Sequence, residues 1–303
     1  MLMPLAGLAL SEAYRVWTVI TLCAAMLAAF RIAPHWHTLV FALVFPAVAL
    51  SVATGQNGNL SAALIGAGLF LLPPKPLVAG IFFGLLAAYK PQLALVIPFC
   101  LIGGRHYRTL IVMAATAAAT MLLSLVVFGA DTILAFLSSI VATTHSHFDD
   151  TSWRLWGRMP TVLSAVLQFT QSKALAWTMQ TLAAAVSLAG LTCVWRSSTL
   201  PALRALSLVA SIPLATPYLF DYDLAVLLIP FAFIMLDIRS SGLDLKRFCL
   251  VMGLWVMPPT IYFAAAFQPA TALWPIAPIV WMLLLGYAVL ASHENALIRK
   301  PSA

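Results

Sequence analysis

Lys90 interrupts a stretch of this 303-residue chain that is otherwise apolar. It follows Tyr89 and precedes Pro91, and a proline disfavours helical geometry in the residue before it. A lysine inside an apolar segment is costly unless it reaches the membrane surface, forms a pair or faces a cavity. A phosphate group is a natural partner for its point charge. Lys90 is therefore a candidate phosphate ligand, and a lysine that only reaches lipid headgroups is the alternative.

Two acids, Asp221 and Asp223, precede another apolar stretch, and Tyr218 and Tyr222 lie beside them. An aspartate at a helix N-terminus accepts hydrogen bonds from free N–H groups, which explains one of the two acids. Two carboxylates exceed what capping requires. Asp223 or Asp221 is therefore a candidate general base, and the tyrosines are candidate ligands for a hydroxyl-rich substrate.

The segment 55–59, Gly-Gln-Asn-Gly-Asn, lies between two apolar blocks. The amides of Gln56 and Asn57 can both donate and accept hydrogen bonds, which suits a hydroxyl-rich ligand. Glycine and asparagine are also common in simple turns between helices, and this alternative stays open.

The longest polar stretch is 144–160. Arg154 and Arg158 could hold a phosphate, with tryptophans nearby that could stack on a ligand or anchor the chain at a membrane interface. His145 and His147 stand two residues apart, which is a weak metal signal, so we predict no metal site and no cofactor.

The elements that carry these side chains are predicted to be membrane-spanning helices. Hydrophobic residues make up 63% of the chain and charged residues only 8%, too few to coat a soluble protein of this size. Several apolar blocks are long enough to cross a hydrocarbon core of about 30 Å and lack the alternation of barrel strands; they are 14–30, 37–54, 108–129, 174–195 and 273–292. The net charge of +7 does not indicate nucleic-acid binding, because the bases are scattered.

These blocks predict one all-α polytopic membrane domain over residues 1–303, with about nine full spans. The segment 77–103 is predicted to be a short re-entrant or broken helix pair, because each half is too short to span and Lys90-Pro91 divides them. A single kinked helix is the alternative. A polar outer loop is expected at 130–172, beginning with an amphipathic run that could lie in the interface, and a cytoplasmic tail at 293–303.

The positive charges predict the orientation. Alternate loops hold eleven and five of the sixteen bases, and the richer set is predicted to be cytoplasmic. The smaller set is Arg15, Lys90, Arg154, Arg158 and Lys173. The N-terminus is then outside and the C-terminus inside, and all the polar clusters described above share the outer face.

The same residues resemble glycosyltransferase family 87, a family of polytopic enzymes of the GT-C type. The resemblance rests on Gly55-Gln56-Asn57, on the run into Pro73-Pro74-Lys75, on Tyr89-Lys90-Pro91 and on Thr216-Pro217-Tyr218 followed by Asp221, and covers about residues 10–240. It implies a polyprenyl-phosphate sugar donor, mannose in bacterial members, and transfer with inversion at the periplasmic face of the inner membrane. Lys90 would match the position near the donor phosphate. Family members carry a first span and a loop with the catalytic aspartate that we expect this chain to lack.

The leading hypothesis is therefore a membrane hexosyltransferase that uses a polyprenyl-phosphate donor and a lipid or glycan acceptor. An inactive truncated form is a variant of this hypothesis. A transporter or flippase for a lipid or polar solute is the competing class, and it predicts polar residues within several spans and internal repeats. A non-catalytic membrane scaffold is the third.

Overall fold

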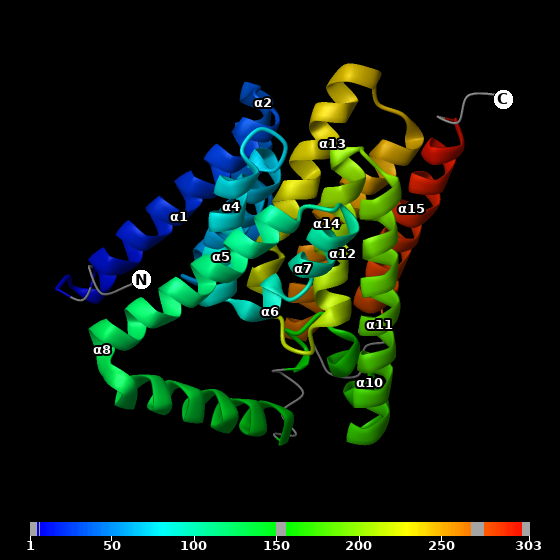
Figure 1. Cartoon of the computed structure of the whole chain (residues 1–303). Coiled ribbons are helices and arrows are strands. Elements are labelled where there is room, and N and C mark those ends of the chain that lie inside the picture. The colour runs from blue at the N-terminus through cyan, green and yellow to red at the C-terminus, as the bar shows by residue number, and fades with distance from the viewer. Residues whose placement is uncertain (1–4, 6, 150–155, 268–275, 299–303) are drawn as a thin grey trace.

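The computed structural model describes residues 5, 7–149, 156–267 and 276–298, and its regular elements there are all helices (Figure 1). Their order is α1 (Leu10–Ile32), α2 (Trp36–Leu43), α3 (Pro46–Ala53), α4 (Gly58–Leu71), α5 (Pro76–Tyr89), α6 (Pro91–Ala94), α7 (Ile97–Gly103), α8 (Tyr107–Asp149), α10 (Val162–Thr170), α11 (Lys173–Ser197), α12 (Pro201–Ala215), the 3₁₀ helix η2 (Asp221–Leu227), α13 (Leu228–Ser241), α14 (Leu245–Phe267) and α15 (Ile276–Ile298). The predicted all-helical membrane architecture is confirmed, while residues 150–155, part of the predicted outer loop, lie outside the described residues.

The number of long spans is smaller than the predicted nine. Five described helices are long and apolar enough to cross a membrane, and α2 with α3 adds a sixth if that bent pair counts as one span. Four further apolar segments are only 10–17 residues long: α4, α5, α6 with α7, and α12. At 1.5 Å per residue, the 14 residues of α4 reach only about 21 Å.

Prolines explain where two of the apolar blocks break. The predicted block 37–54 bends by 52° between α2 and α3, where Pro46 begins the second helix. The predicted interruption at Lys90 is also present: α5 ends at Tyr89 and α6 begins at Pro91. Proline suits a first helical position, where no N–H is needed, and it disfavours continuing the preceding helix.

The core of the bundle is formed by the short helices and by η2 with α13. Every residue of α12 from Ala205 to Ala215 is buried, as are most residues from Asp221 to Ile234. The long helix α8 lies mostly outside this core and bends at Gly129, whose φ of 81° is easily adopted only by glycine. After the bend α8 runs across the lower end of the bundle in Figure 1, and the predicted amphipathic run from Asp131 is helical there.

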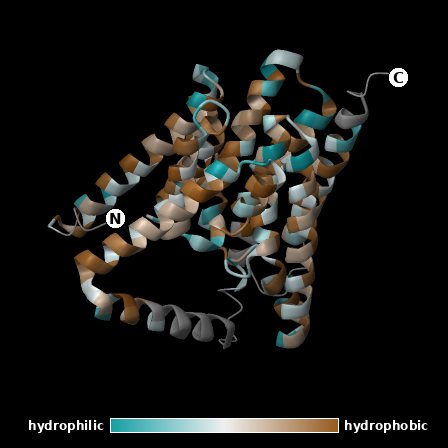
Figure 2. Ribbon diagram, viewed as in Figure 1, coloured by the Kyte–Doolittle hydropathy of each residue, from teal (hydrophilic) through white to brown (hydrophobic). Residues whose placement is uncertain are grey.

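The bundle has two polar ends, and Figure 2 shows hydrophobic colour along the helices with hydrophilic colour near their ends. Three bases of the larger predicted set make contacts near helix ends: Arg239 donates to the carbonyl of Pro34, and Arg105 and Arg196 line one hollow. Lys90, at the junction of α5 and α6, and Arg158, just before α10, contact the two acids of η2. The predicted distribution of the bases between the two faces, and which face is cytoplasmic, stay predictions.

Candidate functional site

The break between α5 and α6 places Lys90 inside the bundle. The residue has a non-helical backbone, with φ −144° and ψ 71°, and its N–H donates to the carbonyl of Leu86. Only 6% of Lys90 is exposed. A lysine this deeply buried needs partners for its charge.

Two oxygens supply those partners. The Lys90 ammonium forms an ion pair with one carboxylate oxygen of Asp223 and donates to the amide oxygen of Asn57 at 2.6 Å. The ring of Tyr222 lies beneath the ammonium, 5.2 Å from its centroid. The lysine break, the amide turn and the acid-bearing helix, which the sequence placed only on a shared face, therefore meet at one point.

Asp223 lies in the first turn of η2 and is 2% exposed. Its second carboxylate oxygen accepts a hydrogen bond from the N–H of Phe220 at 3.3 Å. This bond is the capping contact that the sequence allowed for one of the two acids. Asp223 therefore combines a capping role with a buried ion pair.

Asp221 is completely buried and has a different partner. Arg158 donates to both of its carboxylate oxygens, from Nε and from Nη2, each at 2.9 Å. The N–H of Asp221 donates in turn to the carbonyl of Arg158, also at 2.9 Å. This bidentate pair with a backbone bond fixes the segment around Arg158 against η2.

The segment around Arg158 is held from its other side as well. The indole of Trp281, in α15, donates to the carbonyl of Pro160 at 3.1 Å. The hydroxyl of Ser164 donates to the carbonyl of Trp156, and the hydroxyl of Thr161 donates to the carbonyl of Pro217. Residues 156–161 thus link α10, α15 and η2.

A glycine allows α4 to approach η2 closely. A Cβ atom on Gly58 would lie 2.0 Å from the carbonyl oxygen of Tyr222, a distance that no side chain tolerates. Gly55, at the preceding turn, has φ +63° and lies against the ring of Tyr14, whose hydroxyl donates to the carbonyl of Val52 at 2.7 Å. The predicted amide turn is therefore also a packing device that brings Asn57 to Lys90.

The structure separates the predicted site residues into those at the cluster and those away from it. Lys90, Asn57 and Asp223 are in contact, Tyr222 stacks beside them, and Arg158 pairs with Asp221. Gln56 is exposed. Its hydrogen bonds are made by its backbone, which donates to the carbonyl of Ser51 and accepts from the hydroxyl of Ser51. Arg154 lies outside the described residues.

Tyr218 is half-buried, with its ring at a right angle to that of Phe220 and 5.3 Å from it. Burial and the nearby Asp223 carboxylate raise the pKa of the Tyr218 hydroxyl. The side chain is therefore neutral at physiological pH and able to donate a hydrogen bond.

Sequence reasoning missed several residues that build the site. Tyr89 donates to the carbonyl of Asn57 at 3.2 Å, and Ser51 accepts from the N–H of Asn59. Gly58 had a local signal, since it lies inside the amide-rich turn. Nothing local indicated Ser51 or the contact between Arg158 and Asp221, which are 63 residues apart.

The charged residues at this point are well suited to acid–base and anion chemistry. Among the described residues the buried charged side chains are Lys90, Asp221 and Asp223, and all three are in this cluster. An ionised carboxylate can accept a proton, and an ammonium can stabilise a departing anion. No group of three or more histidine, cysteine, aspartate or glutamate side chains that could hold a metal ion is found in the described part of the chain.

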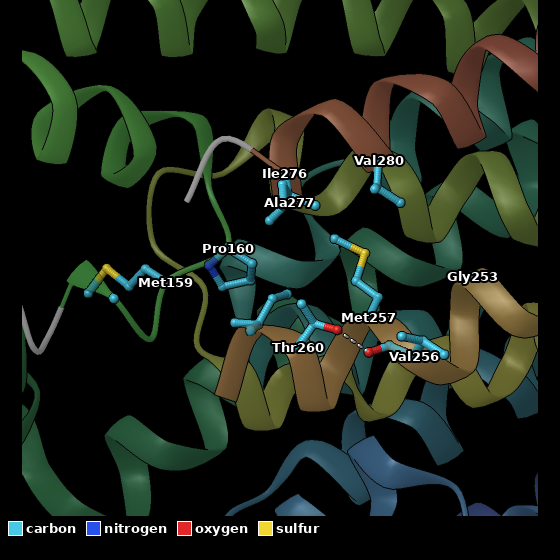
Figure 3. A pocket seen from close by; sticks show the side chains of 11 residues that line it. Met159, Pro160, Gly253, Val256, Met257, Thr260, Ile276, Ala277 and Val280 are labelled. Atoms are coloured by element: carbon cyan, nitrogen blue, oxygen red, sulfur yellow. Dashed lines mark hydrogen bonds between the residues drawn. The ribbon is translucent and has the colours of Figure 1, made fainter. Parts of the chain in front are cut away.

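An apolar cavity of about 180 Å³ lies beside the Arg158 segment (Figure 3). Its walls come from the segment 157–160 and from the facing parts of α14 and α15; the lining includes Met159, Pro160, Gly253, Met257, Ile276 and Val280. A Cβ atom on Gly253 would meet nothing within 4 Å, so the glycine opens this wall. The polar cluster and a hydrocarbon-lined cavity are therefore joined by one short segment.

Comparison with known proteins gives the family. No curated protein and no solved structure matches the chain. The sequence profile of glycosyltransferase family 87 matches residues 1–217, which include Asn57, Lys90 and Arg158 and end shortly before η2. The chain, with its apolar helices and its buried ionic cluster, belongs to glycosyltransferase family 87 and is a membrane glycosyltransferase.

Proposed function

We propose that this protein transfers a hexose, mannose by its resemblance to bacterial family members, from a polyprenyl-phosphate donor to a lipid or glycan acceptor. The reaction takes place at the periplasmic face of the bacterial inner membrane. The lower end of the bundle in Figure 1 is then the periplasmic end, with the N-terminus outside and the C-terminus cytoplasmic.

The buried contact between Lys90, Asp223 and Asn57 carries this proposal. A donor phosphate that enters the cluster competes with Asp223 for the ammonium of Lys90 and frees a carboxylate oxygen. Asp223 then accepts the proton of the acceptor hydroxyl while that oxygen bonds to the anomeric carbon. The bond from the anomeric carbon to the phosphate oxygen breaks, and the phosphate keeps the electron pair beside Lys90.

The other predicted residues surround this reaction. Asn57 orients Lys90, the ring of Tyr222 lies against its ammonium, and Tyr218 lies against Phe220; in this scheme both tyrosines are sugar or acceptor ligands. Arg158 is held by Asp221 next to the apolar cavity, where an anionic headgroup would meet it. Asp221 positions Arg158 in this scheme, and the catalytic base is Asp223.

The depth of the cluster supports a lipid-linked donor. The short helices α4, α5, α6 and α12 each have one end at or near it, and a 14-residue helix covers about 21 Å of a hydrocarbon core of about 30 Å. The cluster therefore lies below the membrane surface if the other ends of these helices reach the opposite interface. A phosphate on a lipid reaches such a depth more readily than a soluble nucleotide sugar does.

The decisive test replaces the base without changing its shape. Asp223→Asn keeps an oxygen acceptor for Lys90 but cannot take the acceptor proton, so transfer should fall by at least about 100-fold. Asp237→Asn, at the opposite end of the bundle, is the matched control and should leave the rate unchanged. Lys90→Ala should also abolish transfer from a polyprenyl-phosphate sugar. Unimpaired turnover in Asp223→Asn would remove the base assignment, and equal use of a nucleotide sugar would remove the donor assignment.

The apolar cavity gives an independent test of the lipid portion. Gly253→Trp fills the cavity with an indole where no backbone atom opposes it. If the donor chain lies there, KM for the lipid donor rises several-fold while kcat changes little. Gly286→Trp, on α15 and equally unobstructed but away from the cavity, is the control. Equal KM values in the two variants would place the donor chain elsewhere.

A further inference from the structure

A second hollow lies at the opposite end of the bundle from the ionic cluster, where α7 ends against α11. Its volume is about 230 Å³, and it is lined by Ile102, Gly103, Arg105, Tyr107, Thr192 and Arg196. A Cβ atom on Gly103 would lie 2.7 Å from the carbonyl oxygen of Thr192, so the two helices touch at its floor. The proposed transfer reaction makes no use of this hollow.

Arg105 occupies a backbone position that favours glycine. Helix α7 ends in a Schellman motif: the N–H of His106 donates to the carbonyl of Leu101, and that of Arg105 to the carbonyl of Ile102. The residue at the position of Arg105 is left-handed in this motif, and its φ is 59°. Glycine is the usual residue there, because a side chain strains this conformation. An arginine held in a strained conformation at the edge of a hollow suggests that its side chain serves a function.

The hollow is positively charged. Both Arg105 and Arg196 line it, and neither forms an ion pair with a carboxylate in the described residues. The N-terminus of α8 begins at Tyr107 in the same lining, and the free N–H groups of a helix N-terminus favour an anion. The lining also holds the C-terminal turns of α7 and α11, whose carbonyl ends disfavour an anion, so the two guanidinium groups supply most of the attraction for a phosphate group.

The surroundings indicate that the phosphate belongs to a lipid. Ile102 and Tyr107 flank the two arginines and are 46% and 55% exposed. An apolar side chain and a tyrosine at a helix end are typical of the membrane interface, where phospholipid headgroups lie. The alternative is that Arg105 and Arg196 only help to orient the protein in the membrane, a role that needs no ligand. That role does not explain why Arg105 has a strained backbone or why the two arginines share one hollow.

We propose that this hollow binds the phosphate of an anionic phospholipid and that Arg105 and Arg196 are its ligands. The site is distinct from the ionic cluster and does not depend on the transfer reaction. Bound lipid at this point would tie α7 and α8 to α11, because the lining residues come from all three helices and the connection between α7 and α8.

Arg105→Gly tests the proposal without destabilising the fold. It removes the guanidinium and also relieves the left-handed backbone, so the thermal midpoint in detergent should not fall. Gln171→Gly is the matched control, because Gln171 has a φ of 53° at the end of α10, remote from the hollow. Arg196→Gln removes the second ligand. The full-length protein is studied in nanodiscs of phosphatidylcholine with or without phosphatidylglycerol, and retained lipid is counted by native mass spectrometry.

The expected result is that retention of phosphatidylglycerol falls by about tenfold in Arg105→Gly and in Arg196→Gln, the loss of one charge-assisted contact, and is unchanged in Gln171→Gly. Equal retention in all variants would overturn the proposal. Inorganic phosphate is added to the detergent-solubilised protein in a separate arm. If it raises the thermal midpoint as much as phosphatidylglycerol does, the ligand is a soluble phosphate and the lipid assignment is wrong.

Discussion

Replacing Lys90 and Asp223, singly and together, separates the structural role of the ion pair from its chemical role. We consider Lys90→Met, Asp223→Leu and the double variant, because methionine has a volume close to that of lysine and leucine keeps the branched outline of aspartate, although it is larger. The two residues are 6% and 2% exposed, so either charge left alone stays buried. The pair therefore belongs to the class in which removal of one partner is most costly.

The magnitude follows from what remains in each variant. In Lys90→Met the Asp223 carboxylate keeps one bond, from the N–H of Phe220, and in Asp223→Leu the Lys90 ammonium keeps one, to Asn57. Each single variant should lower the free energy of unfolding by about 3–5 kcal/mol. The double variant leaves no unpaired buried charge at this point, since Asp221 keeps Arg158, and should be much closer to the wild type than the sum, within about 2 kcal/mol. Asn57 then retains an unused acceptor, which is a smaller penalty.

The assay is reversible unfolding in mixed detergent, read by circular dichroism, with sugar transfer measured on the same samples. All three variants should be inactive, and only the double variant should be near wild-type stability. The exposed pair Arg247–Asp237, whose side chains are 23% and 43% exposed, serves as a control cycle and should show a coupling of at most about 1 kcal/mol. A double variant that loses the full sum of the single effects would refute the buried pair, and an active double variant would refute its role in transfer.

Three further predictions address the surrounding structure. Gly58→Ala should destabilise the protein by at least about 3 kcal/mol in thermal unfolding, because its methyl group would overlap the Tyr222 carbonyl, whereas Gly253→Ala, in open space, should cost no more than about 1 kcal/mol. Gln180→Leu should cost about 2–4 kcal/mol in the same assay, because this buried amide bridges two backbone groups in α10 and α12, and a smaller loss would mean that water replaces the bridge. The raised pKa of Tyr218 favours the neutral form in the folded state, so its contribution to stability is complete below about pH 10 and is lost as pH rises further. Tyr218→Phe should make alkaline unfolding less steep, and an unchanged slope would contradict this.

The helical membrane architecture could be predicted because composition and block length constrain it strongly. Only five or six described segments are long and apolar enough to be full spans, not the predicted nine, because an apolar run of 14 residues, such as α4 or α5, resembles part of a longer span when only hydrophobicity is read. The break at Lys90 was predictable, since a lysine followed by proline both interrupts the helix and needs a partner. The bend between α2 and α3 at Pro46 had the same local signal, but nothing polar accompanied it.

The meeting of Asn57, Lys90 and Asp223 was predictable only as a shared face. Each residue is costly or unusual beside an apolar block, so each indicated a site by itself, and the alternation of helices placed them at one end. Their direct contacts depend on packing over 33 and 133 residues of sequence, which no local pattern encodes. The close fit of Gly58 against Tyr222 is of the same kind, because glycine is common in turns whether or not a distant backbone segment packs against it.

The two acids of η2 connect parts of the protein that the sequence treats separately. Asp223 pairs with the break between α5 and α6, and Asp221, two residues earlier, pairs with the segment that walls the apolar cavity. Both carboxylates are carried by one turn of 3₁₀ helix, so a displacement of that turn would change both pairs together. In the proposed reaction a donor phosphate attracts Lys90 away from Asp223 while its lipid chain lies beside the Arg158 segment. The same turn is then affected by both the phosphate and the lipid chain of the donor. A phosphate without a chain would act only on the pair of Lys90 and Asp223. Turnover should therefore require that the phosphate and the lipid chain are covalently linked.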